Sequence, residues 1–112
     1  MTTAAVHRYP MFLAEEDWAV FREAVAAAYR RARSQPTRDA LDRIDQALTG
    51  AAADAEPDGD ELRYVIHLEE AAFKRLVDAV DRQLRKRGKD QVQRITSEIR
   101  MAYADSTPVG DD

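Results

Sequence analysis

The sequence predicts a mainly helical α+β fold made of two tandem strand-helix-helix repeats, with four helices packed on a short two-stranded sheet. Three observations support this prediction. Apolar residues recur at helical spacing in four segments, two short runs are rich in strand-forming residues, and Pro, Gly and acidic residues separate these segments. The length of 112 residues is enough for one compact domain overall.

The first half is predicted to span residues 9–50 and to begin with a strand. Residues 9–13, YPMFL, form the strand candidate, and Pro10 should restrict it to a sheet edge or a strand start because proline cannot donate a ladder hydrogen bond. A helix then follows, in which Trp18, Phe21 and Val25 lie on one apolar stripe.

The bend after this helix and the helix that follows are predicted from proline, threonine and glycine. Pro36 should stop the first helix, because proline disfavours helical geometry in the residue before it. Thr37 is the expected N-cap of the second helix, and Gly50 its expected C-terminal stop. The stripe of this helix contains Leu41 and Ile44.

The second half is predicted to span residues 62–103, after an acidic linker at 51–61. Residues 62–68, LRYVIHL, are the best strand candidate in the chain. A third helix should carry Phe73 and Val80 on one face and end near Gly88, and a fourth should carry Ile95 and Ile99. We expect residues 1–8 to be a flexible N-terminus and residues 104–112 a disordered tail.

The apolar positions of the two halves match. Phe21 and Val25 correspond to Phe73 and Val77 when the sequences are offset by 52 residues. A duplicated unit explains this match, because two such units could pair their strands and share one core. Coincidence is the alternative, since all amphipathic helices share the same spacing.

Basic residues gather in the two predicted inter-helix bends. The net charge is −4, yet these stretches contain no acidic residue. The residues are Arg30, Arg31, Arg33, Arg38, Arg82, Arg85, Lys86, Arg87 and Lys89. They could compensate the negative ends of helices, dock an acidic protein surface, or bind the phosphates of nucleic acid. No aromatic residue lies among them to stack on bases.

Three aromatic residues near the N-terminus are candidates for an interface. Trp18 is the only tryptophan, and Tyr9 and Phe12 lie just before it. Large aromatic side chains dominate small cores, and they are also enriched in binding hot spots. The sequence leaves both roles open.

No motif for catalysis, metal or cofactor is present. His7 falls in the predicted flexible segment, and His67 with Glu69 supplies at most two ligands of a metal site that needs three or four. Residues 54–60 resemble the start of a calcium loop, but Val65 stands where that loop requires a glutamate. The chain has no cysteine and no phosphate-binding glycine loop. We therefore predict a protein that is not an enzyme and takes no cofactor.

The sequence favours a small protein-binding or regulatory module that acts as a homodimer or as an adaptor. A nucleic-acid-associated protein is the alternative, and a subunit or inhibitor of a larger complex is a third. No apolar stretch is long enough to cross a membrane, and the N-terminus does not resemble a signal peptide, so a cytoplasmic location is expected. The richness in alanine and arginine, with no asparagine, is typical of GC-rich bacteria or their phages.

Overall fold

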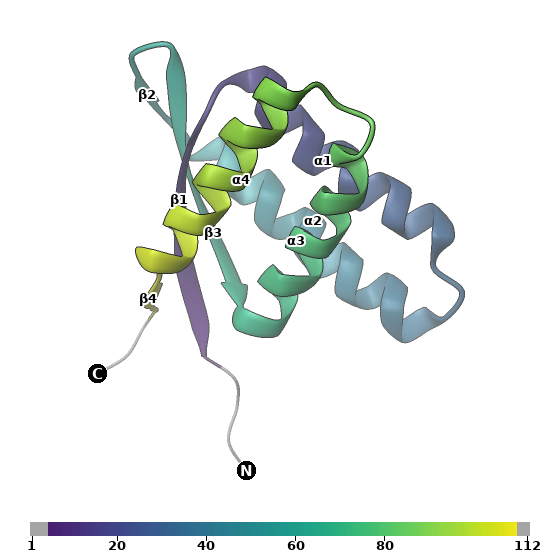
Figure 1. Ribbon diagram of the computed structural model, residues 1–112. Coiled ribbons are helices and arrows are strands. Elements are labelled where there is room, and N and C mark those ends of the chain that lie inside the picture. The colour runs from purple at the N-terminus through teal and green to yellow at the C-terminus, as the bar shows by residue number, and fades with distance from the viewer. Residues whose placement is uncertain (1–4, 110–112) are drawn as a thin grey trace.

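Alternating apolar residues along two strands and apolar stripes along the helices produce an α+β structure. The computed structural model describes residues 5–109, and within these it contains four helices and a four-stranded antiparallel sheet (Figure 1). The elements in chain order are β1 (Val6–Leu13), α1 (Glu15–Arg31), α2 (Gln35–Ala53), β2 (Glu56–Asp58), β3 (Glu61–Glu69), α3 (Glu70–Leu84), α4 (Lys89–Ala104) and β4 (Thr107–Pro108).

The sheet has the strand order β2-β3-β1-β4. The long strands β1 and β3 pair antiparallel over their full common length, from Val6 opposite Glu69 to Leu13 opposite Leu62. The short strands β2 and β4 each cover only part of an outer edge. The expected two-stranded sheet is therefore wrong. Two- and three-residue strands carry too few positions for an alternating pattern to reveal them.

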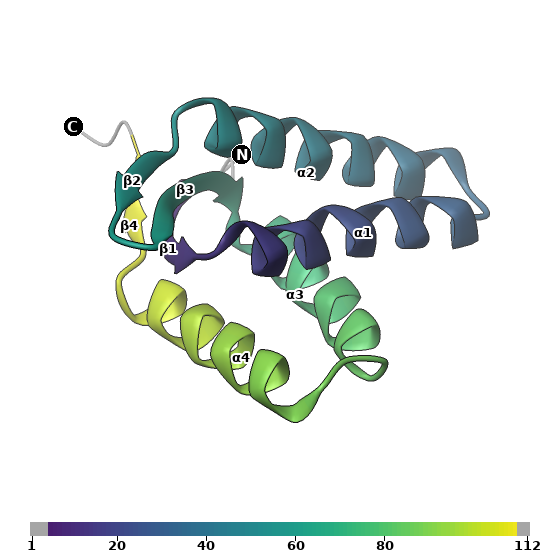
Figure 2. The same ribbon diagram turned by 90° about the horizontal axis from the view of Figure 1, so that it is seen from above.

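The helices pack against one face of the central strands (Figures 1 and 2). Every second residue of β1 and β3 is buried on this face. Helix α2 packs against β3 and α4 against β1, while α1 and α3 pack against each other between them. The opposite face of the sheet is open to solvent and exposes Val6 and Phe12.

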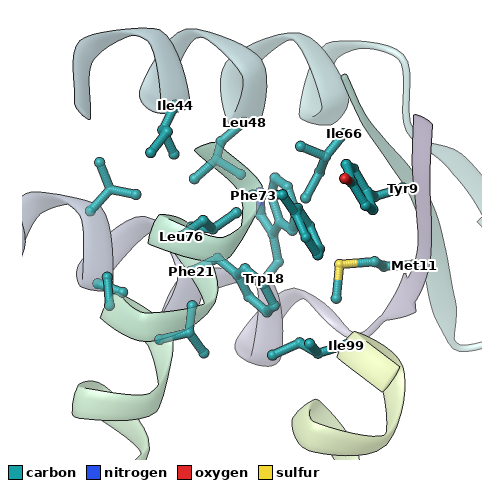
Figure 3. Packing of buried hydrophobic residues seen from close by; sticks show 14 of the residues in the cluster. Tyr9, Met11, Trp18, Phe21, Ile44, Leu48, Ile66, Phe73, Leu76 and Ile99 are labelled. Carbon is teal, nitrogen blue, oxygen red and sulfur yellow. The ribbon is translucent and has the colours of Figure 1, made fainter. Parts of the chain in front are cut away.

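Two aromatic stacks join the helices to the strands at the centre of the core (Figure 3). The rings of Tyr9 and Phe73 stack with centroids 3.7 Å apart, and those of Trp18 and Tyr64 with centroids 3.9 Å apart. Phe21 is fully buried beside them. Each stack joins a strand of one half to a helix of the other, so neither half can form its core alone.

The start and end of α2 differ from the prediction. Ser34 is the N-cap, and its hydroxyl accepts a hydrogen bond from the Thr37 amide at 3.3 Å, while Pro36 lies within the first turn. Proline is tolerated there because the first turn has no amide hydrogen-bond partner to lose. The helix continues past Gly50 to Ala53. One glycine costs about 1 kcal/mol relative to alanine, and Ala51 offsets this cost by packing in the core.

The predicted linker and flexible ends are also partly structured. Residues 56–58 form β2, which turns into β3 at Gly59, the first of two turn residues, with φ of 63°. Glycine adopts this positive φ without strain, as a type II′ hairpin turn requires. In the predicted N-terminus, Val6 and His7 belong to β1, and Thr107 of the predicted tail belongs to β4. The rest of these predictions includes residues 1–4 and 110–112, which lie outside the described residues.

Candidate functional site

The two basic bends lie on the helical side of the molecule, away from the sheet (Figures 1 and 2). Arg31 near the first bend and Arg82 near the second line one cleft between α1, α2 and α3. Arg87 is not available for a ligand, because it forms an ion pair with Glu23 of α1. Arg38 donates a hydrogen bond to the Ala32 carbonyl at 3.4 Å.

The other basic candidates are not brought together in a common cleft. Arg30, Arg33, Arg85, Lys86 and Lys89 are exposed. Among the clefts found in residues 5–109, none is lined by any of these five side chains. The nine predicted residues therefore do not form one continuous binding surface.

The predicted aromatic interface is divided between core and surface. Tyr9 and Trp18 are buried, with 1% and 6% of their surface exposed, so they are core anchors in the folded chain. Phe12 is 36% exposed and lies on the open face of the sheet. Only Phe12 can contact another molecule without rearrangement of the core.

The outer edge of β1 is closed at every position where an amide could point outward. Strand β4 pairs with His7 and Arg8. Pro10, the next residue facing this edge, has no amide hydrogen. The amide of Phe12 donates a hydrogen bond of 2.9 Å to a carboxylate oxygen of Glu98 on α4. Closure of this kind protects a sheet edge from pairing with other chains.

The outer edge of β3 is open along residues 64–69. Strand β2 pairs only with residues 61–63, opposite Arg63 at its far end. Because outward and inward amides alternate along a strand, those of Val65 and His67 point to the same edge as that of Arg63. No hydrogen bond within the described chain occupies either of these amides.

A groove lies beside this open edge. It has a volume of about 390 Å³ and is bounded by the end of β3, the middle of α2 and the start of α3. His67 and Glu69 line it from the strand, Arg43 from α2, and Arg75 from α3. Alanine side chains cover much of the remaining wall, so backbone of another chain can approach the strand closely.

A buried carboxylate fixes α4 next to β1. Asp17 of α1 is 2% exposed, and its two oxygens accept hydrogen bonds of 3.0 Å from the Nε and Nη2 of Arg94 and from the amide of Gln91. Burial alone would raise the pKa of Asp17, but the hydrogen bonds from Arg94 and Gln91 and the Arg94 charge outweigh it and lower this pKa. Arg94 and Glu98 are one helical turn apart, so the same helix also holds Glu98 at the β1 edge.

A second polar cavity, of about 590 Å³, lies at the other end of β1. His7, Glu70, Lys74 and Tyr103 line it. Burial and the nearby carboxylates, Glu70 among them, raise the pKa of Tyr103, so its hydroxyl stays protonated at neutral pH. The arrangement offers hydrogen bonds but no activated nucleophile.

Comparison with known proteins identifies no relative: no family model, no curated protein and no solved structure matches the chain. Across residues 5–109, no helix has both the length and the apolar character needed to cross a membrane. The same residues contain no cluster of three or more His, Asp or Glu side chains that could hold a metal ion.

Loss of the Glu98 side chain should expose the β1 edge. We expect Glu98→Ala to lower the free energy of unfolding by about 1 kcal/mol, because the Phe12 amide loses its hydrogen bond. The variant should also self-associate more readily at high protein concentration. Glu98→Gln keeps an acceptor oxygen and is the control. Urea unfolding and light scattering measure the two effects, and equal behaviour of E98A and E98Q would contradict the closure of this edge.

Proposed function

We propose that this protein is a small non-catalytic protein-binding module that accepts an extended segment of a partner as an additional strand on β3. The observation that supports this is the difference between the two sheet edges: that of β1 is closed, whereas that of β3 is open beside a groove. Strand addition gains affinity from backbone hydrogen bonds and specificity from pockets that receive alternate side chains. An adaptor or regulatory role follows from such binding.

The two edges differ at equivalent positions. Positions 55 residues apart are compared here, because α1 begins at Glu15 and α3 at Glu70. Pro10, without an amide hydrogen, then corresponds to Val65, which has one, and the two face each other in the sheet. Phe12, whose amide is bound by Glu98, corresponds to His67, and an arginine takes the position of that glutamate.

The arginine in question is Arg43 of α2, which lies beside His67 in the groove. A guanidinium group has only donors, so it cannot accept a hydrogen bond from the His67 amide as the Glu98 carboxylate does from Phe12. The β3 edge therefore differs from the β1 edge by two substitutions that both leave an amide without a partner.

We further propose that the two halves arose by duplication. Tyr9 and Tyr64 are 55 residues apart, as are their stacking partners Trp18 and Phe73. The sequence offset of 52, which aligned Phe21 with Phe73, differs from this by almost one helical turn. An amphipathic stripe repeats at every turn, so its spacing alone does not distinguish the two alignments.

The favoured partner is a different chain rather than a second copy. An antiparallel pair of two β3 strands centred on His67 would place Glu69 opposite Val65 of the second copy. Beyond that point, Glu56 on β2 of the second copy would approach Glu70 at the start of α3. Like charges placed close together across strands destabilise a sheet. A homodimer through this edge remains one outcome of the test.

The proposal is tested with Val65→Pro, which gives β3 the residue that closes β1. The variant should fold, because the Val65 amide faces away from β1 and proline is accommodated directly opposite it. The matched control is Val65→Thr, which keeps both the amide and strand propensity. Nine-residue random peptides displayed on phage would be selected on the wild-type protein, and the selected peptides made synthetically.

We expect selected peptides to be rich in β-branched residues and to bind V65P at least about tenfold more weakly than V65T, the equivalent of roughly one lost hydrogen bond. Light scattering of the free protein should give the monomer mass of 12.7 kDa. Peptides that bind V65P and wild type equally would contradict strand addition. A mass of twice this value for wild type but not for V65P would replace the foreign partner with a second copy.

A further inference from the structure

The groove beside β3 continues into a second cleft that is also lined with arginine. The first contains Arg43 and Arg75. The second, of about 250 Å³, contains Arg31, Arg75 and Arg82. Since Arg75 lines both, and α2 and α3 bound both, the two form one channel from the open sheet edge towards the basic bends. We call it the α2–α3 channel.

The charge of this channel is opposite to that of the whole protein. Its four arginines face only two carboxylates, those of Glu69 and Asp78, whereas the chain carries a net charge of −4. Among the described residues, none of these arginines takes part in an ion pair. Arg87, Arg94, Arg22 and Arg63, in contrast, are each paired with an acidic side chain.

The walls of the channel suit a polypeptide better than a nucleic acid. They contain small residues, among them Ala40, Ala72 and Ala79, and no Phe, Tyr or Trp side chain on which a base could stack. Thr37 adds a hydroxyl between the arginines. A backbone that leaves the β3 edge at His67 enters this channel directly, because the same groove contains both.

We propose that the partner segment is acidic next to its strand-forming part, and that Asp or Glu side chains on it bind the arginines of the α2–α3 channel. This inference rests on strand addition at β3, and it specifies the chemistry of the segment that is added. Arginine binds carboxylates with two parallel hydrogen bonds, so an unpaired row of arginines favours a run of carboxylates.

The test uses two synthetic peptides with the same strand-forming segment, chosen from the selection described above. One continues into four Asp or Glu residues and the other into four Asn or Gln residues, at whichever end of the segment gives tighter binding. At low salt we expect the acidic peptide to bind about tenfold more tightly, since exposed ion pairs each add little but several act together. This advantage should shrink at high salt.

Arg75→Gln is the decisive variant, because Arg75 lines both parts of the channel. It should remove most of the acidic peptide's advantage and leave the neutral peptide unaffected. Arg100→Gln is the matched control: it makes the same charge change at an exposed residue of α4 that lines neither cleft, and it should behave as wild type.

The outcomes separate this inference from the proposed function. Equal binding of the two peptides to wild type would overturn the acidic preference while strand addition stands. Failure of both peptides to bind would overturn strand addition as well. A 20-base-pair DNA duplex serves as a third probe. Tighter binding of this duplex than of the acidic peptide, lost in R75Q but not in R100Q, would replace the acidic protein segment with nucleic acid.

Discussion

Replacement of Phe73 with alanine is expected to lower the free energy of unfolding by about 4 kcal/mol, the largest effect of any single substitution considered for this protein. Phe73 is fully buried on α3. Its ring stacks on Tyr9 of β1 at 3.7 Å and meets the edge of Tyr103 of α4 at 5.2 Å. Removal of the ring leaves a cavity where three elements meet, and a rigid core cannot close it.

Two controls separate this role from a general effect of losing an aromatic side chain. Phe73→Leu keeps most of the apolar volume and should cost clearly less than Phe73→Ala. Phe12→Ala removes the same ring from the open sheet face, where Phe12 is 36% exposed, and should cost less than about 1 kcal/mol. Urea unfolding measures all three. A cost for F73A no greater than that for F12A would contradict the position of Phe73 in the core.

Replacement of Asp17 with asparagine is expected to destabilise the fold by about 2 kcal/mol at pH 7. The substitution keeps the shape of the side chain but removes the charge that binds Arg94 through two hydrogen bonds and Gln91 through a third. Hydrogen bonds to a charged group are each worth more than neutral ones. The loss should loosen α4 from α1 and so weaken the support of Glu98 at the β1 edge.

The same variant predicts a pH dependence with a definite sign. The folded state lowers the pKa of Asp17 below the ordinary value of 3.8. A carboxyl group with a lowered pKa stabilises the fold above its unfolded pKa, and this stabilisation is lost as the pH falls through the folded pKa. The difference in unfolding free energy between wild type and D17N should therefore be constant from pH 7 to about pH 5 and shrink below about pH 4. A difference that grows on acidification would contradict the ion pair.

The helices and the two long strands could be predicted because each buries several apolar residues at regular spacing. Trp18 and Phe21 on α1, and Ile95 and Ile99 on α4, are buried as their spacing predicted. The short strands could not be predicted, because β2 and β4 bury no side chain and exist through pairing with β3 and β1. The end of α2 was also missed, since Gly50 was given more weight than the alanines after it.

The proposed binding site was almost invisible in the sequence. Its main feature is the absence of hydrogen bonds at Val65 and His67, and a missing contact leaves no residue pattern. One signal was present: Pro10 in the first strand has no counterpart in the second, where Val65 stands. The basic bends attracted attention because their charge is dense, yet Arg43 and Arg75 of the α2–α3 channel lie outside both bends.

Amide hydrogen exchange in the free protein, followed by NMR residue by residue, tests the open β3 edge most directly. The amides of Tyr64 and Ile66, which point towards β1, should exchange slowly, and those of Val65 and His67 rapidly. Fast and slow exchange alternating along one strand would be the signature of a single unpaired edge. Protection of Val65 and His67 equal to that of their neighbours in the monomer would show that this edge is already occupied, and strand addition would then have no place to occur.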